Sequence, residues 1–184
     1  DRGRKMTQAI LRPLEIKDLD KIMEWVNDPK IVFNFQNFDL KITREAEKAY
    51  LEKILASADD RLFAIETENG TYLGNVGLHN ISSKNKLGRL ALIIGNKEFL
   101  GRGYGQSAIK ELVKYAFDEC GLNKVWLIVA KENEKAKHIY EKVGFAIEGF
   151  LEEEYADRLG KFHDMVRMRM LRREYIALKE RGII

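Results

Sequence analysis

The order of periodic patterns along the chain predicts one domain built on a mixed α/β sheet flanked by helices. Two helical patterns come first, a meander of strand patterns follows, and strands then alternate with helices before a closing hairpin. A chain that combines hairpins with a strand–helix–strand unit forms a sheet with both antiparallel and parallel pairs. The 184 residues contain two prolines, no repeat and no low-complexity linker, which indicates a single domain over residues 1–184.

Composition places the chain among ordinary globular proteins. Hydrophobic residues make up 45% and charged residues 33%, and 32 Lys and Arg against 29 Asp and Glu leave a net charge of +3. That excess is too small to indicate a nucleic-acid partner. The single cysteine, Cys120, excludes an internal disulfide and a cysteine-based zinc site. The longest apolar stretches, Leu90–Ile94 and Val125–Ala130, fall far short of the roughly 20 residues that span a bilayer.

We therefore expect a cytoplasmic protein that binds neither a metal nor a membrane. A lone cysteine suits a reducing compartment, and no signal-peptide core is visible. Met6 is interpreted as the native initiator, so that Asp1–Lys5 is an appended segment.

The first third of the chain predicts one strand and two helices. Leu11–Leu14 is a short strand pattern. Apolar residues then recur at the i, i+3, i+4, i+7 spacing of a helix with one buried face, namely Leu19, Ile22, Met23 and Val26. Pro29 ends this helix, and Thr43 caps a second helix that runs to about Ala58. The buried stripe of the second helix is predicted to contain Ala46, Tyr50 and Ile54.

The rest of the chain alternates strand and helix patterns. Leu62–Glu66 and Thr71–Leu78 flank Asn69-Gly70, the strongest signal for a two-residue hairpin turn. The later elements follow in this order: a loop at Ser82–Lys86, a strand at Leu90–Gly95, a helix from Gly105 to Cys120 closed by Gly121, a strand at Val125–Ala130, a helix from Asn133 to Val143 ended by Gly144, a hairpin of Phe145–Tyr155 and Phe162–Leu171 around Leu159-Gly160, and a final helix at Arg172–Glu180.

The most informative segment is the glycine turn, Leu100-Gly101-Arg102-Gly103-Tyr104-Gly105, between a strand and a helix. Alternating glycines let the backbone turn tightly and approach a ligand without a Cβ in the way. The N–H groups at the helix start form a phosphate site, to which Arg102 could add a charge. The alternatives are a plain surface turn and a dinucleotide fingerprint over Gly103–Ala108. That fingerprint needs an acid roughly 20 residues on, whereas Glu132 lies 29 residues beyond Gly103.

The helix from Asn133 to Val143 carries the second candidate group. Asn133 is placed to cap the helix, and Tyr140, seven residues on, projects from nearly the same face. Ala136 between them keeps that face open. A tyrosine hydroxyl can donate a proton to a leaving group. The alternative interpretation makes Asn133 a simple cap and Tyr140 a half-buried packing residue.

Together these segments resemble the GNAT acetyltransferase superfamily, in which a strand, a glycine turn, a helix and a strand precede a helix with Asn133 and Tyr140 in these positions. The core resemblance covers Leu87–Phe145. Lys124–Phe145 and the closing hairpin with Gly160–Met168 look similar to the spermidine/diamine and ribosomal-protein N-acetyltransferase branch. The resemblance implies a splayed, mostly antiparallel sheet flanked by helices.

The resemblance also implies the reaction. Acetyl-CoA is the co-substrate, and its acetyl group passes directly to an amine without an acyl-enzyme, so Cys120 needs no role. The strand around Ile93 pairs with the pantetheine arm, the glycine turn holds the pyrophosphate, Asn133 contacts the pantetheine, and Tyr140 protonates the departing thiolate. The cofactor set implied in this way is Leu92, Ile93, Ile94, Leu100, Gly101, Arg102, Gly103, Tyr104, Gly105, Gln106, Asn133, Lys137, Tyr140 and Lys142.

Two departures from the family pattern keep the acceptor open. Leu100 stands where the motif often has Arg or Gln, and Leu90 stands where similar polyamine enzymes often have a glutamate. The region Ile31–Leu40 has only Asp39 among its three phenylalanines, Phe33, Phe35 and Phe38, which join either the core or a substrate or subunit contact. Because polycations need carboxylates, a polyamine is one candidate beside a protein N-terminal amine and an amino sugar. A homodimer or larger homo-oligomer is the family-level expectation, and a non-catalytic acetyl-CoA sensor is the alternative function.

A base must remove a proton from the ammonium form of the acceptor before the amine can attack. His79 and Glu152 are the candidates, each with a solvated surface role as the alternative. The run Glu152–Glu154 could steer a cationic amine. Arg167 and Arg169 share one strand face, which indicates either a solvated surface or an RNA contact.

Overall fold

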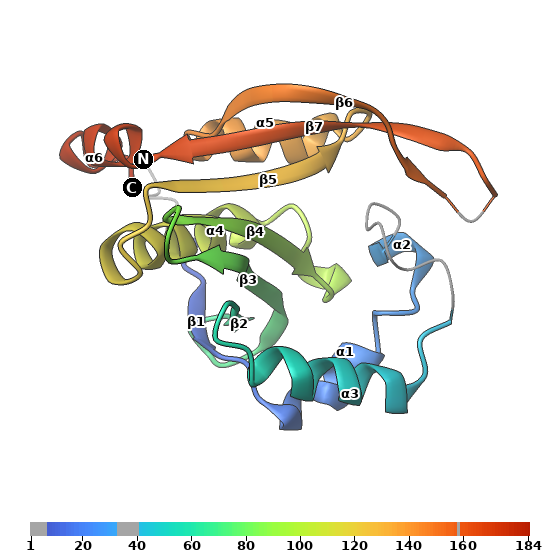
Figure 1. Cartoon of the computed structure of the whole chain (residues 1–184). Coiled ribbons are helices and arrows are strands. Elements are labelled where there is room, and N and C mark those ends of the chain that lie inside the picture. Colours follow the sequence, from blue (N-terminus) through green and yellow to red (C-terminus); the bar gives the residue numbers. More distant parts are fainter. Residues whose placement is uncertain (1–6, 33–40, 158) are drawn as a thin grey trace, which may run out of the picture.

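The computed structural model describes residues 7–32, 41–157 and 159–184 and contains one seven-stranded sheet (Figure 1). The strands lie in the order β1-β2-β3-β4-β5-β7-β6, and every neighbouring pair is antiparallel except the parallel pair β4–β5. The predicted mixed, mostly antiparallel sheet is thereby confirmed. The strands are β1 (Ile10–Pro13), β2 (Arg61–Glu66), β3 (Tyr72–Ser82), β4 (Leu87–Ile94), β5 (Lys124–Ala130), β6 (Ala146–Ala156) and β7 (Phe162–Leu171).

Helices cover both faces of the sheet (Figure 1). One core lies under α4, α5 and α6 and includes Leu112, Val143 and Met168. A smaller core lies under α1 and α3 and includes Ile22 and Leu51. The helical elements are η1 (Ile16–Asp18), α1 (Leu19–Met23), α2 (Pro29–Val32), α3 (Arg44–Leu55), η2 (Lys97–Phe99), α4 (Tyr104–Lys114), the π-helical turn η3 (Tyr115–Glu119), α5 (Glu134–Val143) and α6 (Arg172–Glu180).

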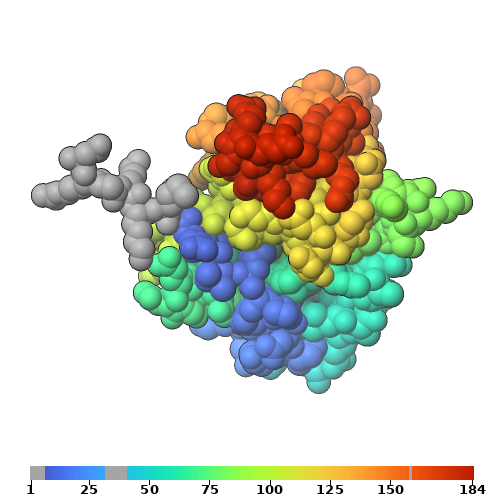
Figure 2. Space-filling view, turned by 90° about the vertical axis from the view of Figure 1, so that its left-hand side faces the viewer, coloured from blue at the N-terminus to red at the C-terminus, as the bar shows by residue number. Residues whose placement is uncertain are grey.

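The caps and ends of the C-terminal helices match the sequence signals. Asn133 caps α5 with a hydrogen bond from the Ala136 N–H to its Oδ1 at 3.1 Å, and Gly144 ends that helix at φ +116°. Gly121 follows α4 and η3 at φ +62°. Figure 2 shows α6 lying over the segment that contains η3, where Tyr175 stacks on Phe117 at 4.8 Å. These local signals were sufficient because each one satisfies backbone groups of its own helix.

The N-terminal helices differ from the sequence prediction. The first ends at Met23, and Pro29 begins α2 rather than ending the preceding helix, because proline suits a first helical position. Thr43 caps α3 as predicted, accepting a hydrogen bond from the Ala46 N–H at 3.2 Å. The predicted buried stripe is partly wrong: Ile54 packs against the smaller core, but Ala46 and Tyr50 are exposed, and Leu51 is buried instead at 1% exposure. The run Phe33, Phe35 and Phe38 lies outside the described residues.

The hairpin at Asn69-Gly70 forms, but with a longer turn than predicted. The Gly70 N–H donates to the Thr67 carbonyl at 2.9 Å, and the β2–β3 register shifts between Ile65 and Glu66. Within this loop only Gly70 has a positive φ, at +79°. A two-residue type I′ turn needs positive φ at both central residues, so the chain uses a four-residue turn beside a bulge.

Trp25 docks the smaller core on the end of β4, and Gly95 provides the space. A Cβ at Gly95 would lie 2.3–2.5 Å from atoms of the Trp25 indole. We expect Gly95→Ala to lower the free energy of unfolding by about 2 kcal/mol, because overpacking a tight site costs roughly 1–3 kcal/mol. Urea denaturation measures this loss. Gly149→Ala is the matched control, since its Cβ would meet nothing within 4 Å, and equal stabilities of the two variants would contradict the prediction.

Candidate active site

The strands β4 and β5 part halfway along their length. Their pairing is limited to Leu87↔Lys124, Gly88↔Val125 and Arg89↔Trp126. Beyond these pairs, β4 continues to bond to β3, and β5 continues to bond to β7, and Figure 1 shows the two ribbons diverging. The edge of Leu90–Ile94 that faces β5 therefore has no strand partner, and an extended ligand can pair with such an edge as an added strand.

The glycine turn carries an exposed row of backbone donors at the start of α4. Gly101 and Gly103 adopt φ of +75° and +91°, and Gly103 caps the helix without a side chain. The first bond within the helix runs from the Ser107 N–H to the Gly103 carbonyl at 3.0 Å. The N–H groups of Tyr104, Gly105 and Gln106 consequently have no acceptor within the helix, and the helix dipole adds positive potential at this end. This geometry suits a phosphate.

The glycine turn lies directly against the parted half of β4. A Cβ at Gly105 would be 3.5 Å from Leu92 and 3.8 Å from Ile94, and a Cβ at Gly101 would meet nothing within 4 Å. Arg102 lies over the Phe99 ring at 5.1 Å, and Leu100 is 46% exposed. The residues predicted for the pyrophosphate and for the pantetheine arm are thus brought together.

The structure also places the predicted groups of α5. The Oδ1 of Asn133 is used by the helix cap, which leaves its amide donors without a partner among the described residues. Lys137 donates to the Lys131 carbonyl and to Glu134, both at 2.6 Å, so its ammonium is folded onto its own helix. Lys142 is exposed at the opposite end of α5 from Asn133.

Tyr140 presents an unpartnered hydroxyl on the inner side of α5. The side chain is half-buried, and its ring packs edge-on against Phe145 at 5.8 Å. Among the described residues no group hydrogen-bonds the hydroxyl. Burial raises the pKa of Tyr140 to about 12, so the phenol remains protonated at neutral pH. A protonated donor without an internal partner is the group that a general acid requires.

The two predicted bases lie at opposite ends of the parted strands. His79 pairs with Arg89 in the β3–β4 register, where β4 still pairs with β5, and its Nδ1 lies 3.0 Å from Asp60. Burial, and next the charge of Arg89, lower the pKa of His79, so its imidazole is neutral at neutral pH. Glu152 follows Leu151, beyond the far end of β5, in a bulge of β6, so the structure does not bring the two together.

A second histidine, which the sequence did not single out, joins three segments beside that far end. The Nδ1 of His163 lies 2.8 Å from Glu132 and its Nε2 lies 2.9 Å from Asp157. Hydrogen bonds to Asp157 and then to Glu132 raise the pKa of His163. No local sequence signal marks this cluster, because the partners of His163 are 31 and 6 residues away in the chain.

The two histidines are expected to titrate on opposite sides of the ordinary value of 6.5. The raised pKa of His163 stabilises the fold below pH 6.5, and this contribution is lost as pH rises through its folded pKa. The lowered pKa of His79 has the opposite sign, since stability is lost as pH falls below 6.5 towards its folded pKa. NMR titration of the imidazole C–H signals, assigned with His79→Asn and His163→Asn, measures both values. Coincident midpoints would contradict the prediction.

A pocket of about 380 Å³ lies beside the end of β4, on the side of α1, between Trp25, Tyr72 and Gly95. Its rim carries three carboxylates and two ammonium groups: Glu24, Asp28, Glu98, Lys21 and Lys97. Its aromatic wall gives a small amine an apolar surface. Glu24 is paired with Lys21 and Asp28 with Lys97, which leaves Glu98 as the rim carboxylate without an ion pair among the described residues.

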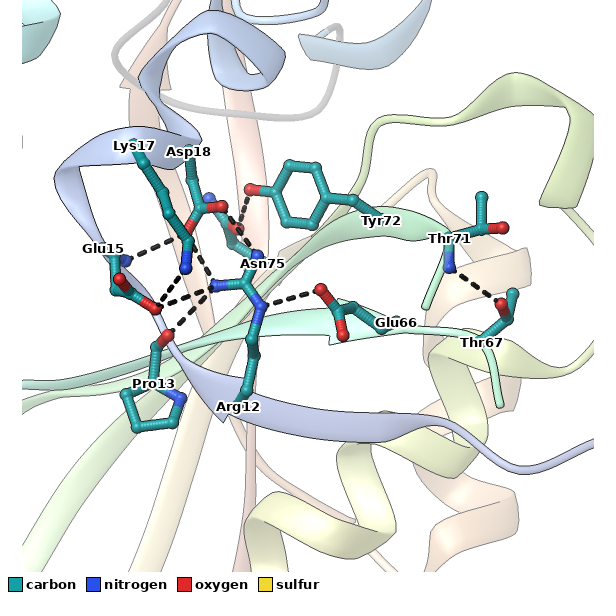
Figure 3. A network of polar contacts seen from close by, with 10 residues as sticks. All are labelled: Arg12, Pro13, Glu15, Lys17, Asp18, Glu66, Thr67, Thr71, Tyr72 and Asn75. Atoms are coloured by element: carbon teal, nitrogen blue, oxygen red, sulfur yellow. Dashed lines mark hydrogen bonds and ion pairs between the residues drawn. The ribbon is translucent and has the colours of Figure 1, made fainter. Parts of the chain in front are cut away.

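The pocket wall is held by a polar network around Arg12 (Figure 3). Arg12 donates to both oxygens of Asp18 at 2.8 and 2.7 Å and to Glu66 at 2.7 Å, which ties β1 to η1 and β2. The Tyr72 hydroxyl donates to Asn75 beside this network. A part-buried bidentate pair of this kind fixes geometry as well as adding stability.

Other predicted features have structural partners within the chain. Leu90, at the position where similar polyamine enzymes often have a glutamate, is 3% exposed in the core under α4. Arg169 donates to Glu174 at 2.6–2.7 Å. Within the described residues, no group of three or more His, Cys, Asp and Glu is arranged to hold a metal ion. No helix in the described part of the chain is both long and apolar enough to span a membrane.

Comparison with known proteins agrees with this geometry. The sequence model of the acetyltransferase (GNAT) domain matches residues 8–146. The spermidine N(1)-acetyltransferase of Escherichia coli K12 is 32% identical over 167 residues, which cover 91% of this chain and 88% of that protein. The putative ribosomal N-acetyltransferase YdaF of Bacillus subtilis is 35% identical over 108 residues, 58% of this chain and 57% of that protein.

A solved structure extends the match to nearly the whole fold. The crystal structure of spermidine N-acetyltransferase from Vibrio cholerae in complex with CoA and spermine superposes with a TM-score of 0.85 at 30% identity, covering 92% of this chain and 98% of that one. The dinucleotide interpretation of the glycine turn does not fit, because the turn follows the fourth strand of a mostly antiparallel sheet. The family match, the parted strands and the glycine turn lead to one assignment: the chain belongs to the GNAT acetyltransferase family.

Proposed function

We propose that the protein transfers the acetyl group of acetyl-CoA directly to a primary amine. The observation that carries this proposal is the apposition of the glycine turn to the unpaired edge of β4, because one site then offers a phosphate-binding helix start and a strand partner for an extended arm. The unpartnered hydroxyl of Tyr140 supports transfer rather than binding alone.

The described residues fit acetyl-CoA as co-substrate. Gly101, Gly103 and the N–H groups that begin α4 would hold the pyrophosphate, with room above the turn that a side chain would fill. The edge of Leu92–Ile94 would pair with the pantetheine amides, and Asn133 would donate its remaining amide hydrogens. The co-substrate supplies a thioester carbonyl that an amine can attack, with the thiolate as leaving group.

The reaction then needs two proton transfers, one to the leaving thiolate and one from the acceptor ammonium. Tyr140 donates its phenolic proton to the departing sulfur as the carbon–sulfur bond breaks. His79, whose imidazole is neutral, accepts the proton that the ammonium must lose, and Glu152 is the second candidate. Because no side chain is acylated in this scheme, Cys120 has no part in it.

The acceptor classes are polyamines, protein N-terminal amines and amino sugars. The similar proteins support polyamines and protein N-terminal amines, because they are named as spermidine acetyltransferases and as a putative ribosomal acetyltransferase. The aromatic wall of Trp25 and Tyr72, with the Glu98 carboxylate at the rim, supports an amine near the end of β4.

Release of the CoA thiol across an amine panel tests the proposal. The panel contains spermidine and related polyamines, short peptides with free Ala or Ser N-termini, and amino sugars with their nucleotide-linked forms. Acceptor-dependent release with one class is the expected result. Binding of acetyl-CoA without release from any amine would instead favour a non-catalytic sensor.

A further inference from the structure

Arg89 is a half-buried cation that has no partner among the described residues. It lies on β4 at the last position that pairs with β5. Its Nε is buried and has no hydrogen-bond acceptor, and among the described residues no carboxylate forms an ion pair with its guanidinium. A cation that is partly removed from water without a counter-charge is costly. Such a group in the middle of a sheet indicates a partner beyond the described residues, which a bound ligand can supply.

Trp126 presents a second unpartnered donor beside Arg89. The two residues are opposite each other in the β4–β5 register, so their side chains lie side by side on one face. The indole Nε1 is buried and has no acceptor. The Arg167 guanidinium covers the Trp126 ring at 4.0 Å. Because these groups are donors without acceptor capacity, their natural complement is an oxygen anion.

The two donors lie on the sheet face opposite the glycine turn. Leu90 and Leu92 point towards α4, so the alternation of β4 turns Arg89 to the face of α1 and α3. His79 is its neighbour on β3. The glycine turn and the two unpartnered donors thus lie on opposite sides of the sheet.

Two carboxylates that contact the neighbours of these donors, His79 and Arg167, already have partners. Asp60 binds His79 at 3.0 Å and accepts the Ser57 hydroxyl at 2.6 Å. Glu148 forms an ion pair with Lys124 and lies 3.0 Å from the Arg167 Nε. Neither carboxylate forms an ion pair with Arg89, so within the described residues its positive charge has no direct counter-charge.

We propose that Arg89 and the Trp126 indole N–H bind a carboxylate or phosphate oxygen of the acceptor. The acceptor is then an amine that also carries an acidic group, held beside His79. This inference rests on the proposed acetyl transfer and narrows its acceptor class. A polyamine, which has only positive charges, would meet repulsion at Arg89.

Matched acceptor pairs test this subsite by kinetics. β-Alanine and β-alaninamide differ only in a carboxylate, and O-phosphoethanolamine and ethanolamine differ only in a phosphate. We expect kcat/KM at least about tenfold higher for the acidic member of one pair, in line with a charge-assisted contact. Which pair responds distinguishes a carboxylate from a phosphate.

Three variants isolate Arg89 from the intrinsic reactivity of each amine. Arg89→Gln should abolish the preference for the acidic member of the pair, whatever its effect on the absolute rates through His79. Arg89→Lys should retain part of the preference, because lysine keeps a positive charge but lacks the planar guanidinium that binds two oxygens at once. Arg44→Gln is the control, since it removes the same charge from an exposed ion pair with Asp20. Equal kcat/KM within both pairs, or a preference that survives Arg89→Gln, would overturn the proposal.

A second measurement does not depend on turnover. The protein has two indole N–H signals, and Trp25→Phe assigns that of Trp126. Titration with inorganic phosphate and with β-alanine should shift the Trp126 signal saturably in the native protein and not in Arg89→Gln. A silent Trp126 would overturn the subsite even if acetyl transfer proceeds. A responsive Trp126 without transfer to any amine would support the subsite and refute the proposed function.

Discussion

Replacing Tyr140 with phenylalanine is expected to lower kcat about 100-fold while the Kd for CoA changes by less than about twofold. General-acid catalysis contributes roughly 10²–10⁴-fold, and the variant removes only the hydroxyl that would protonate the thiolate. The ring contact with Phe145 at 5.8 Å is kept, so the fold of α5 should be preserved. Single-turnover measurement of acetyl transfer reports the chemical step without interference from product release.

The control for this experiment is Tyr175→Phe. Tyr175 is a buried tyrosine whose hydroxyl donates to Asp118 at 2.7 Å, in a contact between α6 and η3 away from Tyr140. Its loss should reduce stability and leave kcat unchanged. An unchanged single-turnover rate in Tyr140→Phe would remove Tyr140 from the mechanism.

The pH dependence of the same rate provides a separate check on Tyr140. Because its pKa is raised to about 12, loss of the phenolic proton should not lower the rate until the pH approaches that value. The rising limb at low pH should follow a pKa below 6.5 if His79 is the base, since burial and Arg89 lower its pKa. A falling limb near pH 10 that disappears in Tyr140→Phe would contradict the burial of the phenol.

The second large effect is expected at Gly103. Its φ of +91° strains any residue with a Cβ, at a cost of roughly 1–2 kcal/mol, and the turn relieves that strain by moving the N–H groups of Tyr104 and Gly105. We expect Gly103→Ala to raise the Kd for CoA at least about tenfold, because those donors must all point at one phosphate. Calorimetric titration with CoA measures this loss directly.

Gly121 provides a matched control beyond the opposite end of the same helical segment. It also has a positive φ, +62°, and a Cβ there would meet nothing within 4 Å. Gly121→Ala should therefore lose a similar free energy of unfolding without any change in CoA affinity. If both variants bind CoA as the native protein does, the glycine turn is not the phosphate site.

The elements that the sequence predicted well are those whose signals are local. The cap at Thr43, the cap at Asn133 and the end at Gly144 each satisfy backbone groups within one turn of the helix. The glycine turn was recognisable for the same reason, since its residues are contiguous and their positive φ values follow from the absence of a Cβ.

The errors share a different physical origin. Leu51 rather than Tyr50 faces the core because packing against α1 sets the rotation of α3, and an amphipathic pattern with a broad apolar arc allows both rotations. The turn at Gly70 lengthened because the β2–β3 register, a property of two strands together, set its span. Neither the rotation of α3 nor the β2–β3 register is determined by the residues of one segment alone.

The candidate site divides in the same way. The sequence by itself determined the contiguous parts: the glycine turn, the strand before it, and the helix that presents Asn133 and Tyr140. Only the tertiary structure placed Arg89 against Trp126, His79 against Asp60, and His163 between Glu132 and Asp157. These groups come from strands and loops that are distant in the chain, and their proximity depends on strand order and register. Burial then decides which of their charges are paired and which are left for a ligand.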